Sequence, residues 1–471
     1  MNTKIYLSAC LILSVYFFKA QTNKEFEEYK KNEAKAFQDY KEKENKEFAN
    51  FLKQRWAPFT SKKGQPAPIN PKPLVIPTNV PKPIDQPNKD NLPLVKPELK
   101  GLELKPAPQP FVASDKFESK KAIVFYGTPL SIGYNPFILQ HVSSISEDGL
   151  GNYWDLMCSK NYSTFVNEIE AISVSLSLND WGKYLLVKKI SEQFHQNKND
   201  QICLQFFILN QLGFDSKVAK ADDNFVLLLP TEELIYGISF IPINGKKYYV
   251  INSNGSSFYT FNKSFSSKNK SISFNSNKAL TINDDIKQKV FTLKNGKTII
   301  IDYNANAINY LNDFPQAELS VFFNYPVTEI TEMSILRELK PQLVGLSEID
   351  AVNFLLSFLH SSFEYKTDDQ QFGREKWFYP EHLFFYPFSD CEDRSILFAY
   401  LVKSLLNLEV IGLNYENHVS TAVLFNGDVK GDKIVYKNKS YLACDPTYIG
   451  ASVGMTMPQF INATPKVIDI K

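Results

Sequence analysis

The sequence predicts an α+β protein, with helices and antiparallel strands in successive stretches of the chain. Apolar residues recur with helical period after Asn197 and after Cys391, and strand-like runs follow in each case. Of the 471 residues, 44% are hydrophobic and 14% are aromatic, so the chain can bury a large core. At roughly 150 residues per domain, this length corresponds to about three units.

The charge balance argues against a nucleic-acid partner. Lysine and arginine total 52, and aspartate and glutamate total 51, whereas nucleic-acid-binding domains usually carry a basic excess. Five cysteines are too few for a disulfide scaffold in a chain of this length. We therefore expect neither a nucleic-acid partner nor a disulfide-stabilised fold.

Residues 1–20 have the pattern of a secretory signal peptide. Lys4 supplies a positive charge, Ile5–Phe18 is apolar, and Ala20 is a small residue before a polar segment. Leu7–Cys10 resembles a lipoprotein signal, but the apolar run before its cysteine is short and continues after it. No later stretch is apolar enough to span a bilayer. We expect an exported protein (periplasmic, cell-surface or secreted) without a membrane span.

Residues 21–56 predict a charged helix with an eleven-residue repeat. Aromatic residues recur in pairs, at Phe26/Tyr29, Phe37/Tyr40 and Phe48/Phe51. Eleven residues make three turns of a slightly underwound helix, so the pairs form one stripe. The stripe either packs on the body of its own chain, which we favour, or associates with a second chain.

Residues 57–113 predict a proline-rich linker, because fourteen of the 26 prolines lie in Ala57–Phe111. Proline fixes φ and lacks an amide donor, so neither a helix nor a central strand is expected there. We expect an extended spacer laid along the surface, and recognition of the prolines by a partner is the alternative.

Three further units complete the expected organisation. They are an α/β region at 114–256, a β-rich region at 257–330 and a catalytic domain at 331–471. In the β-rich region, Lys270–Phe274 alternates as an antiparallel strand does, and Thr298–Asp302 suits a buried strand. In the last unit, Ser347 can cap a helix with an apolar face.

The last unit places three reactive residue types at the ends of predicted elements. Ser389 or Asp390 caps a helix, at whose start Cys391 lies. His418 opens one strand and Asp445 closes another, with 27 residues separating each member of the set from the next. At element ends the side chains can converge.

These residue types belong together in nucleophilic catalysis. A thiol with a pKa of about 8.5 is mostly protonated at neutral pH, and only the thiolate attacks carbonyls well. A helix N-terminus and an imidazolium lower that pKa, and a carboxylate fixes the imidazole tautomer. The Cys391 amide is a natural oxyanion donor, and we predict Tyr386 as a second donor. The charged neighbours of Cys391 argue against its burial, and Glu392 and Asp393 should raise its pKa slightly.

The motifs Asp390–Leu397, His418 at a strand start and Cys444–Tyr448 resemble those of the transglutaminase-like superfamily, especially its exported members in Bacteroidetes bacteria. The resemblance covers Ser347–Gly454 and is weak before it; Ser395 stands where the family often has alanine. It implies a papain-like α+β core with a Cys-His-Asp triad that acts on a protein or peptide. A cysteine peptidase or amidase is our first expectation. The alternatives are a cross-linking transglutaminase and a non-catalytic cell-envelope binding module.

The segment 197–252 repeats the order of the later motifs. It contains an apolar helix followed by two strand-like runs, and Asn199, Asn224 and Asn252 align with the triad at separations of 192 to 194 residues. The alignment indicates either an internal duplication with an inactive first copy or chance similarity. Unlike strand orders would exclude the duplication.

Other candidate residues are given lesser roles. His382 is the alternative base, although a surface position is expected for it. Cys203 and Cys444 are expected in the core. The remaining histidines share no ligand spacing with cysteine or acidic residues, so no metal site is expected: His141, His195 and His360. No phosphate-binding glycine loop is present, so no cofactor is expected.

Overall fold

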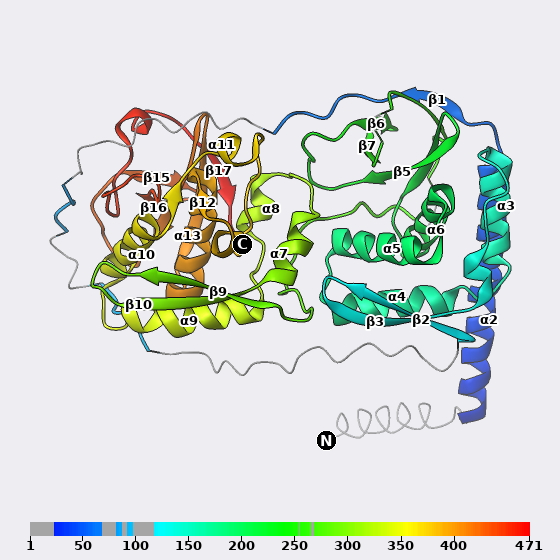
Figure 1. Cartoon of the computed structure of the whole chain (residues 1–471), viewed down its shortest axis with the longest axis horizontal. Helices are drawn as coiled ribbons and strands as arrows, with labels where there is room; N and C mark the ends of the chain where they lie inside the picture. Colours follow the sequence, from blue (N-terminus) through cyan, green and yellow to red (C-terminus); the bar gives the residue numbers. More distant parts are fainter. Residues whose placement is uncertain (1–22, 68–81, 87–91, 98–116, 254, 265–267) are drawn as a thin grey trace, which may run out of the picture.

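The computed structural model describes residues 23–67, 82–86, 92–97, 117–253, 255–264 and 268–471, and the predicted signal peptide lies outside them. These residues form two lobes side by side, joined by a continuous core (Figure 1). Both lobes combine helices with an antiparallel sheet, as an α+β protein does. None of the described helices is long and apolar enough to cross a membrane.

The first lobe contains a six-stranded sheet in the order β1-β8-β4-β5-β7-β6. Its strands are β1 (Ala57–Thr60), β4 (Lys217–Ala221), β5 (Asn224–Pro230), β6 (Phe240–Ile243), β7 (Lys246–Ile251) and β8 (Ser257–Thr260). The other elements of this lobe are β2 (Ser119–Phe125), β3 (Thr128–Tyr134), the 3-10 helix η2 (Pro136–Leu139), α3 (Glu147–Cys158), α4 (Ser163–Ser175), α5 (Asp180–Phe194) and α6 (Lys198–Gln211).

The second lobe contains a five-stranded sheet in the order β15-β16-β14-β13-β17. Its strands are β13 (Glu409–Tyr415), β14 (His418–Leu424), β15 (Lys433–Tyr436), β16 (Lys439–Cys444) and β17 (Lys466–Asp469). The main helices are α9 (Glu329–Leu343), α10 (Glu348–Ser362) and α13 (Cys391–Leu406). The smaller elements are β9 (Ile286–Thr292), β10 (Thr298–Asn304), α7 (Ala305–Asn312), α8 (Leu319–Phe323), β11 (Glu364–Tyr365), α11 (Asp368–Phe372), α12 (His382–Phe385), β12 (Phe388–Ser389) and η3 (Pro458–Phe460).

The two lobes share one topology. Apart from the extra strand β1, the order β8-β4-β5-β7-β6 corresponds strand for strand to β17-β13-β14-β16-β15, and all neighbours are antiparallel. In each lobe the long helix before the sheet packs on the two strands that follow it, α6 on β4 and β5 and α13 on β13 and β14.

The strand registers also correspond. Asn224 opens β5 opposite Ala221, as His418 opens β14 opposite Tyr415. The helix–sheet unit of the second lobe therefore has a counterpart of the same strand order in the first lobe, and an internal duplication as its origin stays a prediction.

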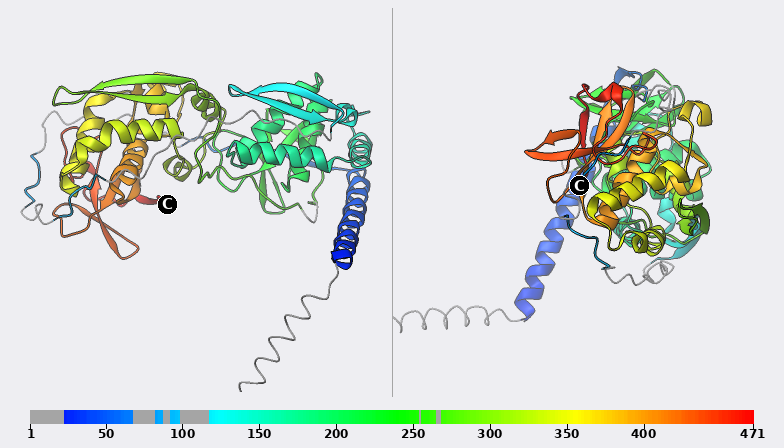
Figure 2. Two further views of the ribbon diagram at one scale, coloured as in Figure 1. Left: turned by 90° about the horizontal axis from the view of Figure 1, so that it is seen from below. Right: turned by 90° about the vertical axis from the view of Figure 1, so that its left-hand side faces the viewer.

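The charged helix is α2 (Asn23–Leu52), and its last aromatic pair packs on the first lobe. Phe48 is buried, with its ring centroid 4.8 Å from that of Trp154, and Asn45 donates to the Tyr162 hydroxyl at 2.8 Å. The earlier part of α2 projects away from the body (Figure 2). Tyr40 is 57% exposed there. Packing on the chain's own body is confirmed for the last pair, and association with a second chain stays a prediction.

The linker begins later than residue 57. β1 pairs with β8 at the edge of the first sheet, where a strand can include Pro58 because its missing amide bond is not needed on the open side. Further along, the described parts of the linker lie on the second lobe: Leu92 is buried, and the Val95 amide donates to the Leu346 carbonyl. The expectation of a surface-bound extended segment is confirmed for these residues.

The prediction of a β-rich region at residues 257–330 is only partly correct. Thr298–Asp302 lies in β10 as expected, and Ile299 and Ile301 are buried. Lys270–Phe274 makes isolated bridges to Phe214 and Thr231 rather than a strand, and β8 belongs to the first lobe. The two helices α7 and α8 were not expected. Short apolar runs carry too little periodicity to separate helix from strand.

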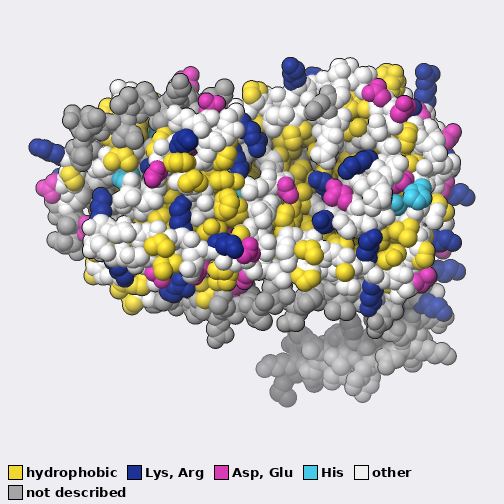
Figure 3. All heavy atoms as spheres, viewed as in Figure 1, with side chains coloured by type: hydrophobic (Ala, Val, Ile, Leu, Met, Phe, Trp, Pro, Cys, Tyr) yellow, Lys and Arg dark blue, Asp and Glu magenta, His cyan; other side chains and the backbone are white. Residues whose placement is uncertain are grey.

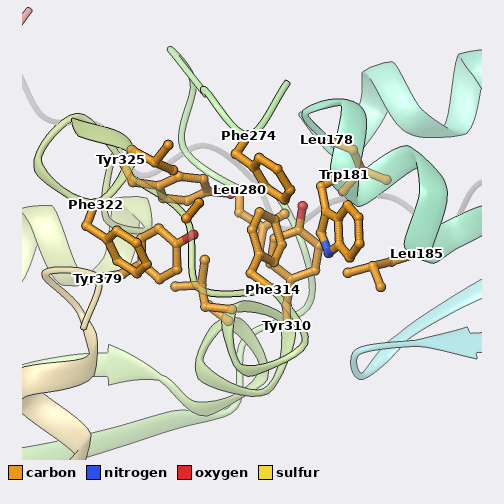
Figure 4. Packing of buried hydrophobic residues seen from close by; sticks show 14 of the residues in the cluster. Leu178, Trp181, Leu185, Phe274, Leu280, Tyr310, Phe314, Phe322, Tyr325 and Tyr379 are labelled. Carbon is orange, nitrogen blue, oxygen red and sulfur yellow. The ribbon is translucent and has the colours of Figure 1, made fainter. Parts of the chain in front are cut away.

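The lobes meet through an aromatic cluster (Figure 4). Trp181 of α5 lies 5.1 Å from Phe274 and 6.4 Å from Phe314 between ring centroids, and Phe314 lies 5.9 Å from Tyr379. Because these large rings are buried together, separating the lobes would expose extensive apolar surface. The junction holds the two copies in one arrangement.

Candidate active site

Cys391 is the first residue of α13, as predicted, and Asp390 is the N-cap. The carboxylate of Asp393 reaches back to the Asp390 amide at 3.3 Å and also accepts from the Phe378 amide at 2.9 Å. These contacts occupy free donors at the helix start and hold the preceding loop against it.

The expectation that Cys391 is exposed is wrong. Its exposed fraction is 5%, and Glu392, Asp393 and Arg394 are equally buried. Arg394 accounts for part of the difference, because it has hydrogen-bond partners inside the protein: Nη2 donates to the Phe363 carbonyl at 2.6 Å and Nε to the Ser389 hydroxyl at 3.2 Å. A sequence pattern of charges does not reveal such internal partners.

His418 and Asp445 meet as predicted. Nε2 of His418 lies 2.7 Å from Oδ2 of Asp445, and both side chains are buried. The amide of Thr447 donates to the other carboxylate oxygen at 2.9 Å. Although burial alone would raise it, the pKa of Asp445 is held below its usual value by the charge of His418 and these hydrogen bonds. A carboxylate that accepts from Nε2 leaves Nδ1 as the free nitrogen of the ring.

The sulfur of Cys391 lies beside β14, the strand that His418 opens, but its hydrogen bonds are not to His418. Its thiol donates to Oε2 of Glu392 at 2.9 Å, and the amide of Val419, the residue after His418, donates to the sulfur. Among the described residues no hydrogen bond joins the sulfur to the His418 ring. The structure thus pairs His418 directly with Asp445, and it places the Cys391 sulfur against the amide of the residue that follows His418.

The pKa of the Cys391 thiol is raised well above its usual range. Burial is the largest cause, and the carboxylates of Glu392 and Asp390 add to it, while the Val419 amide acts in the opposite direction. The predicted slight rise was therefore too small. In this arrangement the thiol is protonated at neutral pH.

Buried carboxyl groups surround the start of α13. Burial raises the pKa of Asp368 to about 10, with the charge of Asp393 adding to it, and it raises the pKa values of Asp390 and Asp393 well above their usual range. The carboxyl groups of Asp368, Asp390 and Glu392 lie within 4.8 Å of one another. This spacing would suit a cation, but shared protons also account for it.

Two aromatic residues that the sequence did not single out border the site. The ring of Phe460, in η3, stacks on His418 with centroids 5.1 Å apart and planes 8° apart. Tyr365 pairs with Ser389 in the short β11–β12 ladder, and burial followed by the charge of Cys391 raises its pKa. Phe460 comes 42 residues after His418 and Tyr365 26 before Cys391, so no local pattern identified them.

The remaining predicted residues have other environments. The Tyr386 hydroxyl bonds to Lys376 and to Asn312, and no described hydrogen bond connects it with Cys391, so its role as oxyanion donor stays a prediction. His382 is buried rather than on the surface, and burial lowers its pKa to about 3. Its Nδ1 accepts the Tyr379 amide, which leaves it poorly suited as a base.

The first copy places asparagines at the corresponding positions. Oδ1 of Asn199 accepts the amide of Phe225 at 2.7 Å, just as the sulfur of Cys391 accepts the amide of Val419. Phe225 follows Asn224, as Val419 follows His418. Asn224 is exposed, and the described contacts include no acid–base pair like that of the second lobe. The alignment of Asn199 with Cys391 therefore has a structural counterpart.

A second group of metal-ligating residue types lies in the first lobe. Ligand atoms of His141, His195 and Asp200 are within 4.8 Å of one another. They are 54 and 5 residues apart, so no ligand spacing predicted them. The prediction of no metal site was made from the absence of a ligand spacing along the sequence, and it did not anticipate that His141, His195 and Asp200 lie together in space.

Comparison with known proteins identifies no relative. No family model, no curated protein and no solved structure matches this chain. The functional argument therefore depends on the site itself.

Proposed function

We propose that this protein is an exported thiol-dependent enzyme that hydrolyses amide bonds of a protein or peptide. The observation that carries the proposal is the buried His418–Asp445 pair together with a cysteine at a helix start whose sulfur accepts the amide of Val419, the residue after His418. The resemblance of the three motifs to the transglutaminase-like superfamily supports it. The predicted signal peptide supports export.

The proposed reaction uses each group in turn. Nδ1 of His418 takes the thiol proton as the sulfur attacks the carbonyl carbon, and backbone amides at the start of α13 stabilise the oxyanion. The tetrahedral intermediate collapses, the C–N bond breaks, and the imidazolium gives its proton to the leaving amine. Water, deprotonated by His418, then hydrolyses the thioester and regenerates the thiol. Asp445 keeps the ring oriented and stabilises its charged form.

Substrate entry must change the present arrangement. The sulfur has to leave Glu392 and turn toward His418, and Phe460 has to move from the face of the imidazole. The closed arrangement is then a resting form with a neutral thiol.

A second candidate function is favoured by the raised pKa of Cys391 and by the burial of the triad. In that case the second lobe, like the first, serves only binding, and the protein is a non-catalytic module of the cell envelope. Acyl transfer to an amine would use the same triad as hydrolysis.

Three measurements separate these functions. Release of new amino groups from protein substrates reports hydrolysis, incorporation of a fluorescent amine reports transfer, and absence of both with retained substrate binding supports the module. Cys391→Ala should abolish either activity, while Cys158→Ala, a matched change of a half-buried thiol in the first lobe, should not. Because the resting thiol is neutral, the pair is tested with a peptide chloromethyl ketone, which enters as a substrate does; equal labelling of Cys391 in the wild type and in His418→Ala would contradict an activated pair.

A further inference from the structure

A cluster of two histidines and an aspartate in the first lobe is independent of the proposed active site. His141 follows η2, His195 is the C-cap of α5, and Asp200 lies in the first turn of α6. The turn between α5 and α6 brings His195 and Asp200 together, and the segment after η2 adds His141. Their ligand atoms lie within 4.8 Å of one another, which is the separation that a single metal ion can bridge.

The partners of these residues orient them as ligands. Nε2 of His195 lies 3.1 Å from the Ile138 carbonyl oxygen, which can only accept, so the ring carries its proton on Nε2 and its lone pair on Nδ1. Oδ1 of Asp200 accepts the Val142 amide at 2.8 Å, which leaves Oδ2 for the cluster. Backbone partners of this kind are typical of the outer shell of metal sites.

Burial and access also suit a metal site. His195 and Asp200 are 2% and 3% exposed, whereas the side chain of His141 is 73% exposed, so the cluster opens to solvent on one side.

The ligand types select the metal. Two imidazoles and one carboxylate form a common three-ligand set for zinc, with water as the fourth ligand. Calcium and magnesium prefer six or more oxygen ligands and find one carboxylate here. We propose that His141, His195 and Asp200 bind one zinc ion, which fastens the segment after η2 to the α5–α6 turn. The hydrogen bond of 2.7 Å between Nδ1 of His141 and Oδ2 of Asp200 marks the metal-free form; when zinc takes the lone pair of Nδ1, the ring proton moves through water from Nδ1 to the exposed Nε2, and the imidazole stays neutral.

The test uses the full-length mature chain, freed of metal by a chelator and titrated with zinc against a chromophoric competitor. We expect one equivalent to bind with a Kd tighter than about 1 μM. Cobalt should give the visible absorption of a tetrahedral site. X-ray absorption of the zinc form should show nitrogen and oxygen ligands at about 2.0–2.1 Å and no sulfur at about 2.3 Å.

Variants decide whether these residues are the ligands. His141→Ala changes an exposed side chain, and Asp200→Asn retains an oxygen for the Val142 amide, so both should fold. Each should weaken zinc binding by at least about 100-fold and remove the zinc-dependent rise in Tm. His360→Ala, a histidine change in the second lobe, should bind zinc like the wild type. Absence of stoichiometric binding, unchanged affinity in both variants, or sulfur ligands would each overturn the proposal.

Discussion

Replacing Glu392 by glutamine should make Cys391 more reactive. The thiol donates to Oε2 of Glu392 at 2.9 Å, and the Glu392 carboxylate raises the thiol pKa through both its charge and this hydrogen bond. Glutamine has nearly the same shape but no charge, and its side-chain amide can donate to a thiolate. Glu392→Gln therefore stabilises the anion while it preserves packing at a fully buried position.

The expected size follows from the geometry. Two unit charges at 2.9 Å, in an effective dielectric of about 20, repel by roughly 6 kcal/mol. At about 1.4 kcal/mol per pKa unit, this sets an upper limit of roughly four units. Because burial remains and neighbouring dipoles relax, we expect the thiol pKa to fall by about one to three units.

The assay is the pH dependence of Cys391 alkylation, followed by mass spectrometry together with the ultraviolet absorbance of the thiolate. Asp369→Asn is the matched control, because it removes an exposed carboxylate from a neighbouring segment. It should leave the midpoint unchanged. A midpoint in Glu392→Gln that is equal to or above that of the wild type would refute the electrostatic explanation.

Three further predictions concern catalysis, stability and helix docking. Asp445→Asn should lower kcat by roughly 10²–10⁴-fold with little change in KM, measured by steady-state hydrolysis, since the ring of His418 loses its orienting carboxylate. Asp368 keeps its proton in the folded state up to about pH 10, whereas an unfolded aspartate loses it near pH ~3.9, so stability falls as pH rises between these values. In urea unfolding, Asp368→Asn should flatten this slope by up to about 1.4 kcal/mol per pH unit, and an unchanged slope would contradict the assignment. Phe48→Ala should cost about 3–5 kcal/mol of unfolding free energy, and Tyr40→Ala, at an exposed position of the same stripe, less than about 0.5 kcal/mol; similar losses would contradict the observed docking of α2.

The helix and strands that hold the site residues could be predicted from the sequence, because the signals for them are local. The cap before Cys391, the apolar period of α13 and the strand starting at His418 all depend on neighbours within a few residues. The same holds for the helix capped by Ser347, whose hydroxyl accepts the Asp350 amide at 3.2 Å. Such signals act through hydrogen bonds and burial on a single element.

The burial of the charged residues around Cys391 could not be predicted from neighbouring residues in the sequence. Arg394 finds the Phe363 carbonyl 31 residues away, and Asp368 and Asp390 approach one another across 22 residues. The raised pKa of the thiol follows from this packing rather than from the sequence neighbours alone. Phe460 likewise reaches His418 through a segment that no local pattern connects to it.

The repeated unit shows the division between sequence and tertiary structure most clearly. The nearly constant separation of 192 to 194 residues could be seen in the sequence, but the equal strand order of the two lobes could be seen only in the folded protein. Sequence determined the residue types and the local elements, because capping and hydrophobic period act over a few residues. The tertiary structure decided which charges are buried, which partners they find, and that His141, His195 and Asp200 meet, because those outcomes depend on contacts between distant segments. The surface carries basic and acidic side chains intermixed over the face seen in Figure 3, in keeping with a balanced composition that the sequence already set.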